Sequence, residues 1–193
     1  MNGDASVVTG LILAGGRGSR LGGLDKGLLP YRGRPLVEWA LAGLKPQVGA
    51  ILVSANRNLT AYAHYGYPVL PDALAGYPGP LAGIREGLKA APTPWLLAVP
   101  CDVPQLPPDC AARLLQAALA QHAQAAYARA AGESHYAVLL MQRSLTAALE
   151  AYLQSGGRSV HGFLARQGAL AVDFDDPQAF ANLNTTQDLG LPP

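Results

Sequence analysis

Apolar runs alternate with amphipathic segments along the first part of the chain. The runs are rich in valine, leucine and isoleucine and end at glycine, proline or polar residues, which is typical of buried strands. They predict strands over residues 7–14, 49–55, 67–70 and 95–100. Apolar residues at helical spacing lie between them and predict helices over residues 35–44, 58–65, 79–90 and 108–122. This alternation predicts a three-layer α/β/α fold with a mostly parallel sheet.

The pattern changes after residue 122. The elements predicted there are strands over 124–130 and 135–141, helices over 144–154 and 158–167, and a strand over 169–174. The first two strands flank a tight turn, Ala-Gly-Glu-Ser at 131–134, and predict a late hairpin. The pair Thr185-Thr186 is a cap signal and predicts a short final helix. Because no linker divides the chain, residues 1–193 are expected to form a single domain.

Composition narrows the class of protein. Half of the 193 residues are hydrophobic and the formal net charge is +1. A chain of this length can bury a sizeable single core, and the near-neutral charge excludes a general basic surface for nucleic acid. No apolar run reaches the ~18 residues that span a membrane, and the N-terminus lacks the basic and apolar regions of a signal peptide. We therefore expect a soluble, cytoplasmic protein that binds neither nucleic acid nor a membrane.

The spacing of the cysteines and histidines does not indicate a metal, redox or nucleophilic site. Cys101 and Cys110 lack the spacing of a zinc site or of a Cys-x-x-Cys redox motif. The histidines lie far apart in sequence without metal-ligand spacing; they are His64, His122, His135 and His161. No Ser/His/Asp or Cys/His set for nucleophilic catalysis is recognisable, so these residues are expected on the surface or in packing.

The first predicted strand runs into a stretch with five glycines, LILAGGRGSRLGGLDKGLLP at residues 11–30. Glycine lets backbone N–H groups approach a ligand closely, and successive N–H groups form a nest for an anion. Lys26, with Arg17 and Arg20, adds positive charge, so the stretch is predicted to bind a polyphosphate. A glycine-rich connection without a ligand, in which Lys26 is a solvated charge, is the alternative.

The glycine stretch matches neither common phosphate-binding fingerprint. Leu21 stands where a Rossmann GxGxxG motif needs glycine. Leu24-Asp25 stands where a P-loop needs lysine followed by serine or threonine. The stretch is therefore expected to bind phosphate with another geometry.

Polar residues also follow the other predicted strands. Asp72 follows the third strand, Asp102 follows the fourth, and Ser54-Ala55-Asn56 closes the second. Ligands of open parallel sheets bind at the carboxyl ends of the strands, so these residues and the glycine stretch are expected to meet. Capping explains Asp102 poorly because Val-Pro follows it, and a single carboxylate beside phosphates is typical of a Mg²⁺ site. A cap or turn role remains the alternative for Asp72.

These motifs resemble the molybdenum cofactor guanylyltransferase (MobA) family of nucleotidyltransferases. The matching stretches run along nearly the whole chain: LAGG at 13–16, DKGL at 25–28, GRPL at 33–36, ANR at 55–57, YPGPLAG at 77–83, PCDVP at 100–104 and NLNT at 182–185. The LAGG start is shared with sugar and terpenoid nucleotidyltransferases, whereas DKGL, YPGPLAG and PCDVP are much more specific. The resemblance implies a Rossmann-like nucleotidyltransferase fold. The change of pattern near residue 120 predicts a nucleotide-binding half over about 1–120 and a substrate-facing half over about 121–193.

The resemblance also implies an activity and a set of residues. The enzyme would transfer GMP from GTP to the phosphate of molybdenum-molybdopterin, release pyrophosphate, and make transient contacts with other molybdenum cofactor biosynthesis proteins and apo-molybdoenzymes. The catalytic residues would be Lys26 and Asp102, with Mg²⁺ as cofactor on Asp102. In the family the residues that match Leu13, Ala14, Gly15, Lys26, Asp72 and Asp102 bind GTP. From their place in the glycine stretch and at the strand ends, Gly16, Arg20, Ser54 and Asn56 are expected to bind it too. Asn182 and Asn184 are expected near the active site, one of them beside the metal.

Two positions depart from the family pattern. Ser54 stands where the family often has asparagine, and His135-Tyr136-Ala137 stands where it often has His-Pro-Thr. The residues by themselves do not distinguish GTP from CTP. The alternatives are a nucleotidyltransferase of the same fold with another NTP or phosphorylated substrate, and a non-catalytic nucleotide-binding module that releases no pyrophosphate.

Overall fold

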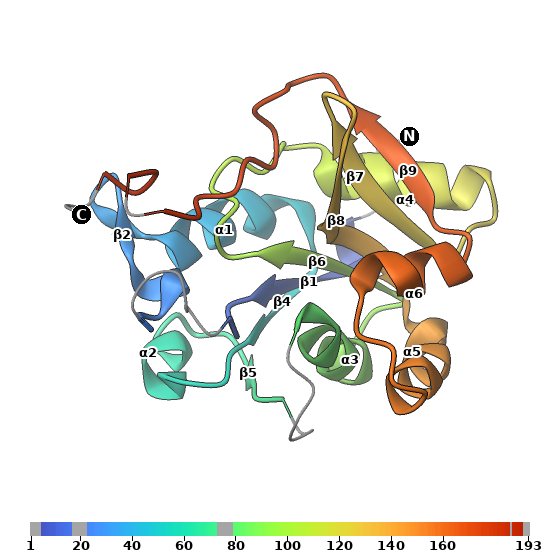
Figure 1. Cartoon of the computed structure of the whole chain (residues 1–193), viewed down its shortest axis with the longest axis horizontal. Coiled ribbons are helices and arrows are strands. Elements are labelled where there is room, and N and C mark those ends of the chain that lie inside the picture. The colour runs from blue at the N-terminus through green and yellow to red at the C-terminus, as the bar shows by residue number, and fades with distance from the viewer. Residues whose placement is uncertain (1–4, 17–22, 73–78, 186, 191–193) are drawn as a thin grey trace.

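The fold is organised around one seven-stranded sheet (Figure 1). The computed structural model describes residues 5–16, 23–72, 79–185 and 187–190. The strands, in the order in which they lie in the sheet, are β5 (Val69–Leu70), β4 (Ala50–Ser54), β1 (Val8–Leu13), β6 (Trp95–Pro100), β8 (Glu133–Gln142), β7 (Ala125–Ala130) and β9 (Leu170–Phe174). Within this sheet β8 is the strand that runs antiparallel to its neighbours, so the predicted mostly parallel sheet with a late hairpin is confirmed.

Helices cover both faces of the sheet (Figure 1). The α-helices are α1 (Leu36–Leu44), α2 (Leu59–Ala63), α3 (Pro80–Ala90), α4 (Cys110–Ala120), α5 (Thr146–Gln154) and α6 (Val160–Arg166). Successive side chains of a strand point to opposite faces, so Leu97 packs in one core cluster with α1 and α4. Its neighbour Leu96 packs in the other cluster, with α3, α5 and α6. The predicted α/β/α layering is therefore confirmed.

Helix α3 lies close to the sheet because it presents glycine there. A Cβ on Gly87 would come within 2.6 Å of Leu11 Cδ2, and a Cβ on Gly83 within 2.3 Å of Ser54 Oγ. Such distances are far below van der Waals contact, so a larger side chain at either position would push the helix outward. Gly83 thus brings the start of α3 close to the end of β4, and Gly87 brings its second half close to β1.

The central strands end in one row. Leu13, the last residue of β1, pairs with Ser54 of β4 and with Pro100 of β6. Ser54 in turn pairs with Leu70 of β5. The polar residues that follow these strands therefore start from one edge of the sheet, as the sequence predicted.

The late hairpin differs from its prediction at the turn. The turn is two residues long, Ala131-Gly132, with φ angles of 50° and 81°. Glu133 and Ser134 belong to β8, where they pair with Ala130 and Arg129. The prediction of a four-residue turn is wrong, because a two-residue turn with two positive φ angles matches the twist of the flanking strands.

Two short features were missed by the sequence pattern. Strands β2 (Pro30–Tyr31) and β3 (Arg34–Pro35) form a separate antiparallel ribbon, too short to show periodicity. Short 3-10 helices also occur, at Ala5–Val7, Lys26–Leu28, Lys45–Gln47 and Arg143–Leu145. The helix predicted after Thr185-Thr186 is wrong for the described residues 187–190, which form a turn; Thr186 itself lies outside the described residues.

After β9 the chain crosses to the edge of the sheet where β1 and β6 end (Figure 1). The backbone N–H of Leu183 donates to the carbonyl of Asp102 at 3.1 Å. Leu189 is buried against Leu36, at the start of α1. The C-terminal segment is thereby held beside the residues that follow β6.

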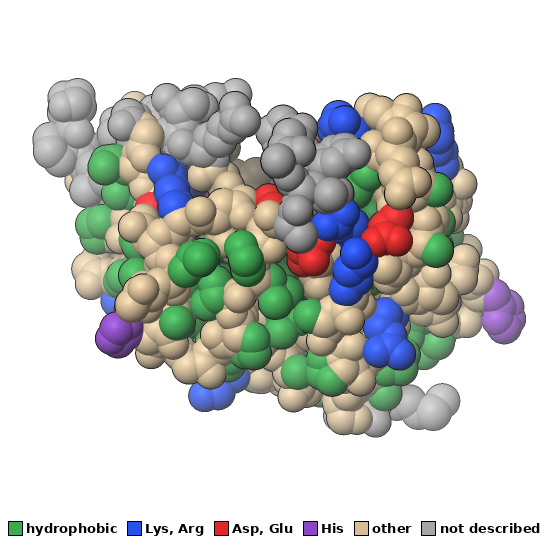
Figure 2. Space-filling view, turned by 90° about the horizontal axis from the view of Figure 1, so that it is seen from below, with side chains coloured by type: hydrophobic (Ala, Val, Ile, Leu, Met, Phe, Trp, Pro, Cys, Tyr) green, Lys and Arg blue, Asp and Glu red, His purple; other side chains and the backbone are tan. Residues whose placement is uncertain are grey.

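The surface agrees with the near-neutral composition. On the face shown in Figure 2, basic side chains lie interspersed with acidic ones rather than forming a continuous basic area. Within the part of the chain that the structure describes, every helix is too short or too polar to cross a bilayer.

Candidate active site

Lys26, Asp102 and Asn184 meet at the carboxyl end of the sheet. The Lys26 ammonium contacts the carboxylate oxygen Oδ2 of Asp102 and donates to the Asn184 side-chain oxygen at 2.8 Å. The Lys26 and Asp102 side chains are 18% and 15% exposed, so the ion pair is mostly buried but reachable from solvent. The structure thus brings together the two predicted catalytic residues and one of the two predicted asparagines.

Asn184 reaches Lys26 because a capped turn holds its backbone. The Asp188 carboxylate accepts from the backbone N–H groups of Asn184 and Thr185, each at 2.8 Å, and Thr185 Oγ1 accepts from the Asp188 N–H. This reciprocal arrangement resembles a capping box. The backbone N–H donors of Thr185 and Asn184 keep the pKa of Asp188 below its usual range. Asn184 is the asparagine that shares the Lys26 ammonium with Asp102, and Asn182 lies two residues earlier on the surface.

Asn56 and Asp72 form a second polar pair at the same edge. Asn56 Nδ2 donates to Asp72 Oδ2 at 2.7 Å, and the Asp72 backbone N–H donates to Asn56 Oδ1 at 2.8 Å. The other carboxylate oxygen of Asp72 is buried without a hydrogen-bond partner among the described residues. Gly15 lies against this pair, because a Cβ there would be 3.1 Å from Asn56 Nδ2. The predicted residues Gly15, Asn56 and Asp72 are therefore neighbours.

Three other predicted binding residues are fixed by the sheet. The Leu13 carbonyl accepts from the Cys101 N–H, and the Ala14 N–H donates to the Ser54 carbonyl. Ser54 is 3% exposed, and Gly83 of α3 packs against its hydroxyl. These contacts fix the point at which the glycine stretch leaves β1, and they leave Ser54 beneath the surface of the site.

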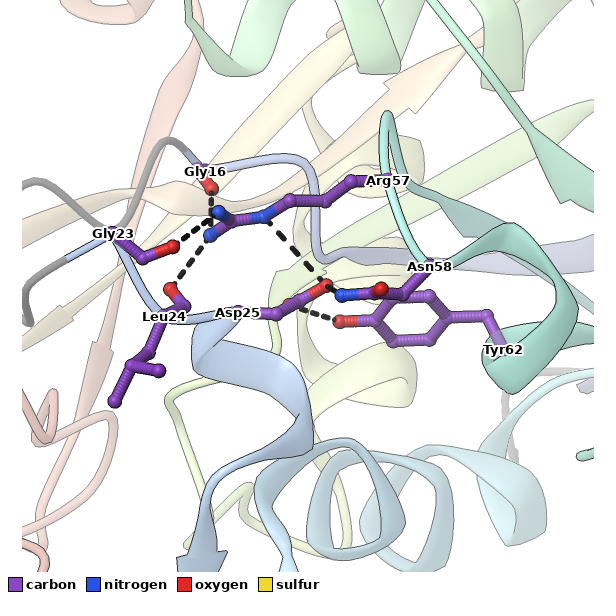
Figure 3. Close-up of polar contacts among 7 residues, drawn as sticks. All are labelled: Gly16, Gly23, Leu24, Asp25, Arg57, Asn58 and Tyr62. Atoms are coloured by element: carbon purple, nitrogen blue, oxygen red, sulfur yellow. Dashed lines mark hydrogen bonds and ion pairs between the residues drawn. The ribbon is translucent and has the colours of Figure 1, made fainter.

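An arginine and an aspartate that the sequence reasoning gave no role hold the ends of the glycine stretch (Figure 3). Arg57 donates to the carbonyls of Gly16 at 3.1 Å, Gly23 at 2.5 Å and Leu24 at 2.6 Å. Its Nε lies 3.7 Å from the buried carboxylate of Asp25. In the sequence both residues stood within matched motifs, Arg57 in ANR and Asp25 in DKGL, without a role of their own. Arg17 and Arg20, which with Lys26 are the basic residues of the glycine stretch, lie outside the described residues.

This geometry agrees with the comparison to known sequences. Residues 10–170 match the family described as MobA-like NTP transferase domain. The chain belongs to this family. It is 48% identical to a molybdenum cofactor guanylyltransferase of Acidovorax sp. (strain JS42), over 96% of this chain and 95% of the relative. It is 46% identical to another of that name from Ralstonia nicotianae, over 95% of each chain.

Solved structures show the same fold for this MobA-like chain. Molybdopterin-guanine dinucleotide biosynthesis protein A from Archaeoglobus fulgidus superposes with a TM-score of 0.78. The superposition covers 94% of this chain and 95% of that one, at 22% sequence identity. The Rossmann-like nucleotidyltransferase fold that the resemblance implied is therefore confirmed, and the family makes this chain an enzyme of the nucleotidyltransferase type.

The oxygen atoms of the site suit one hard divalent cation that is also bound by substrate phosphates. Asp102 offers a carboxylate and Asn184 a carboxamide oxygen, and both already face a cation, the Lys26 ammonium. In the described ranges no three carboxylate, histidine or cysteine side chains gather in a way that would enclose a metal ion. Mg²⁺ is commonly held by one or two carboxylates together with substrate phosphates and water, so the residues present fit it.

Three of the four histidines make contacts apart from Lys26 and Asp102. His135 stacks near Phe180 at 5.3 Å between ring centroids, and His161 near Tyr136 at 4.7 Å. Burial lowers the pKa of His135, which favours its neutral form. His64 contacts the carbonyl of Thr60 within its own helix turn. The expected packing or surface role is confirmed for these three residues.

Both cysteine thiols are expected to be unreactive in the native protein. Cys101 and Cys110 are free and 5% and 0% exposed. Burial raises the pKa of both thiols, and the Asp102 charge raises that of Cys101 further. Because the thiolate is the nucleophile, iodoacetamide at mildly alkaline pH should modify neither residue until guanidinium chloride unfolds the chain. Mass spectrometry that found rapid modification of the native protein would contradict this burial.

Proposed function

We propose that this chain transfers GMP from GTP to the phosphate of molybdenum-molybdopterin, forming the guanine dinucleotide and releasing pyrophosphate. The proposal rests on the meeting of Lys26, Asp102 and Asn184 beside a glycine-rich strand end. A cation, a carboxylate and a carboxamide at that point suit the joining of two phosphate groups. Curated relatives of 46–48% identity that are named molybdenum cofactor guanylyltransferase support the choice of substrates.

The reaction needs charge control more than proton transfer. A phosphate oxygen of the pterin attacks the α-phosphorus of GTP, a new P–O bond forms, and the bond to the pyrophosphate leaving group breaks. The attacking oxygen is already anionic near neutral pH, so no general base has to be assigned. Catalysis of this kind depends mainly on positioning and on neutralising negative charge.

Lys26 is the proposed source of fixed positive charge. Its ammonium lies at the end of the first strand–loop unit, where the phosphates of a bound NTP are expected. Asp102 and Asn184 orient the ammonium before substrate binds, because both accept from it. Asp102 and Asn184 would also hold the divalent cation, with Mg²⁺ as the proposed ion. When bound, Mg²⁺ supplies Lewis-acid stabilisation of negative charge on phosphate oxygens.

The nucleotide is proposed to lie along the row of strand ends. Its binding residues in this proposal are Leu13, Ala14, Gly15, Gly16, Arg20, Lys26, Ser54, Asn56, Asp72 and Asp102. One oxygen of Asp72 is buried and has no hydrogen-bond partner within the described part of the chain, which suits it to accept from a nucleotide hydroxyl or amino group. Within this set Ser54 acts indirectly, because it is buried and supports Gly15 and Gly83 rather than contacting the base.

The organisation and setting of the reaction are part of the same proposal. One continuous sheet joins strands from both halves of the chain, which supports a single domain with the nucleotide at β1, β4, β5 and β6. The pterin would then approach from the side of β7 and β8. We place the reaction in the cytoplasm, with transient contacts to other cofactor biosynthesis proteins and to apo-molybdoenzymes.

Pyrophosphate release with each of the four NTPs tests this function. The assay contains Mg²⁺ and molybdenum-molybdopterin, and controls omit the pterin. We expect release with GTP that depends on the pterin, and little with the other NTPs. Release with CTP would assign the chain to cytidylyl transfer, and NTP binding without any release would favour a non-catalytic module.

A further inference from the structure

Arg57 is placed between the two halves of the glycine stretch. Three of its hydrogen bonds go to backbone carbonyls, those of Gly16 on one side of residues 17–22 and of Gly23 and Leu24 on the other. One nitrogen, Nη2, donates to both Gly16 and Leu24. A single guanidinium therefore holds the entry and the exit of the stretch together.

The charge of Arg57 is already compensated inside the protein. The Asp25 carboxylate lies 3.7 Å from its Nε and is itself buried. Asp25 also accepts from the Tyr62 hydroxyl at 2.6 Å and from Asn58 Nδ2 at 2.9 Å. Burial and the hydrogen bond to Asp25 raise the pKa of Tyr62, so the hydroxyl keeps its proton and remains a donor. The polar side-chain atoms of this cluster point toward one another and toward the carbonyls of Gly16, Gly23 and Leu24 (Figure 3).

The cluster also sets the position of Lys26. Asp25 directly precedes Lys26, and its carbonyl accepts from the Leu28 N–H as the 3-10 helix begins. Asn56, which pairs with Asp72, directly precedes Arg57. The Arg57–Asp25 contact therefore links the Lys26–Asp102 pair to the Asn56–Asp72 pair, because Asp25 adjoins Lys26 and Arg57 adjoins Asn56.

We propose that Arg57 is a positioning residue that clamps the base of the nucleotide-binding glycine stretch and, through Asp25, fixes Lys26. This inference rests on the proposed function for the identity of the ligand. Arginine is required because its planar fork presents several donors in fixed directions, whereas lysine offers one flexible ammonium. The clamp acts through the backbone, so Arg57 itself touches neither nucleotide nor cation.

Two variants and a matched control test the clamp. Arg57→Ala removes the fork, and Arg57→Lys keeps a positive charge beside Asp25. The control is Arg143→Ala, because the Arg143 guanidinium also donates to a backbone carbonyl, that of Ala91. The backbone N–H of Arg143 donates to the Pro94 carbonyl, and the substitution leaves that hydrogen bond in place. All are compared by GTP binding in calorimetry without the pterin, by kcat and KM, and by thermal denaturation.

We expect Arg57→Ala to weaken GTP binding and kcat/KM by about ten- to a hundred-fold, the usual cost of a misplaced site. Millimolar guanidinium, well below unfolding concentrations, should restore part of the loss. Arg57→Lys should remain impaired and Arg143→Ala should bind GTP normally. Lower thermal stability with unchanged GTP binding and kcat/KM, or no rescue by guanidinium, would overturn the positioning role.

A measurement without nucleotide separates the clamp from the proposed function. The ¹³C carbonyl chemical shifts of Gly16, Gly23 and Leu24 should move together in Arg57→Ala, because each carbonyl loses a charged donor. Unchanged shifts would overturn the clamp even if GTP turnover is found. Shifted carbonyls in a protein whose wild type binds no GTP would retain the clamp and reject the proposed function.

Discussion

Asp102→Asn is expected to lower GTP-dependent pyrophosphate release by at least about 10²–10³-fold, the cost of losing one preorganised electrostatic group. The substitution keeps the size of the side chain and removes the charge that faces Lys26. The fold should survive, because the hydrogen bond from Leu183 goes to the backbone carbonyl of residue 102 and remains available. Initial rates at saturating Mg²⁺, together with thermal denaturation, measure the two effects separately.

The matched control for this variant is Glu150→Gln. Glu150 also forms a close ion pair with a lysine, Lys89, at 2.6 Å, but on the paired helices α3 and α5. Loss of charge there should leave the rate within about two-fold, since exposed ion pairs contribute little. Equal turnover in Asp102→Asn and wild type at saturating Mg²⁺ would remove Asp102 from the proposed metal and charge-control role.

Lys26→Met is expected to change cation binding and nucleotide binding in opposite directions. Without nucleotide, the Lys26 ammonium competes for Asp102 and Asn184. Its removal should tighten Mn²⁺ binding by about ten-fold, equivalent to about 1.4 kcal/mol. The same change removes the charge that the proposal assigns to the phosphates, so GTP binding should weaken and turnover should fall by about 10²–10³-fold. Electron paramagnetic resonance of Mn²⁺ and calorimetry of GTP measure these effects.

Lys89→Met is the control for lysine removal, because it breaks the comparable pair with Glu150. It should alter neither Mn²⁺ nor GTP affinity. If Lys26→Met binds GTP with wild-type affinity and keeps the wild-type rate, Lys26 has no role in nucleotide binding or catalysis. If it binds Mn²⁺ more weakly, Lys26 supports the cation site rather than competing with it.

The architecture was predictable because buried parallel strands have a strong pattern. Residues 95–100 read as one apolar run, and that run is β6 with the same ends. Convergence of the strand ends followed from the parallel topology alone. The predicted ends of elements were less accurate where the backbone conformation sets them. At Ala131-Gly132 the positive φ angles set the turn, and a hydrophobic pattern does not reveal them.

The candidate site was predictable in its members but not in its contacts. Lys26 and Asn184 are 158 residues apart in sequence, and their hydrogen bond depends on the turn that Asp188 caps. The sequence shows that Arg57 follows a strand end. It does not show that the guanidinium turns back to the carbonyls of Gly16 and Leu24. Such contacts depend on tertiary placement, which single-residue chemistry does not specify.

The most direct measurement follows the phosphates of GTP. The purified chain is incubated with Mg²⁺, molybdenum-molybdopterin and GTP labelled at either the α- or the γ-phosphate. We expect the α-label in a pterin guanine dinucleotide and the γ-label in pyrophosphate, with both products lost in Asp102→Asn. An α-label that stays in GTP, or that appears in GDP while the γ-label appears in inorganic phosphate, would contradict guanylyl transfer at this site.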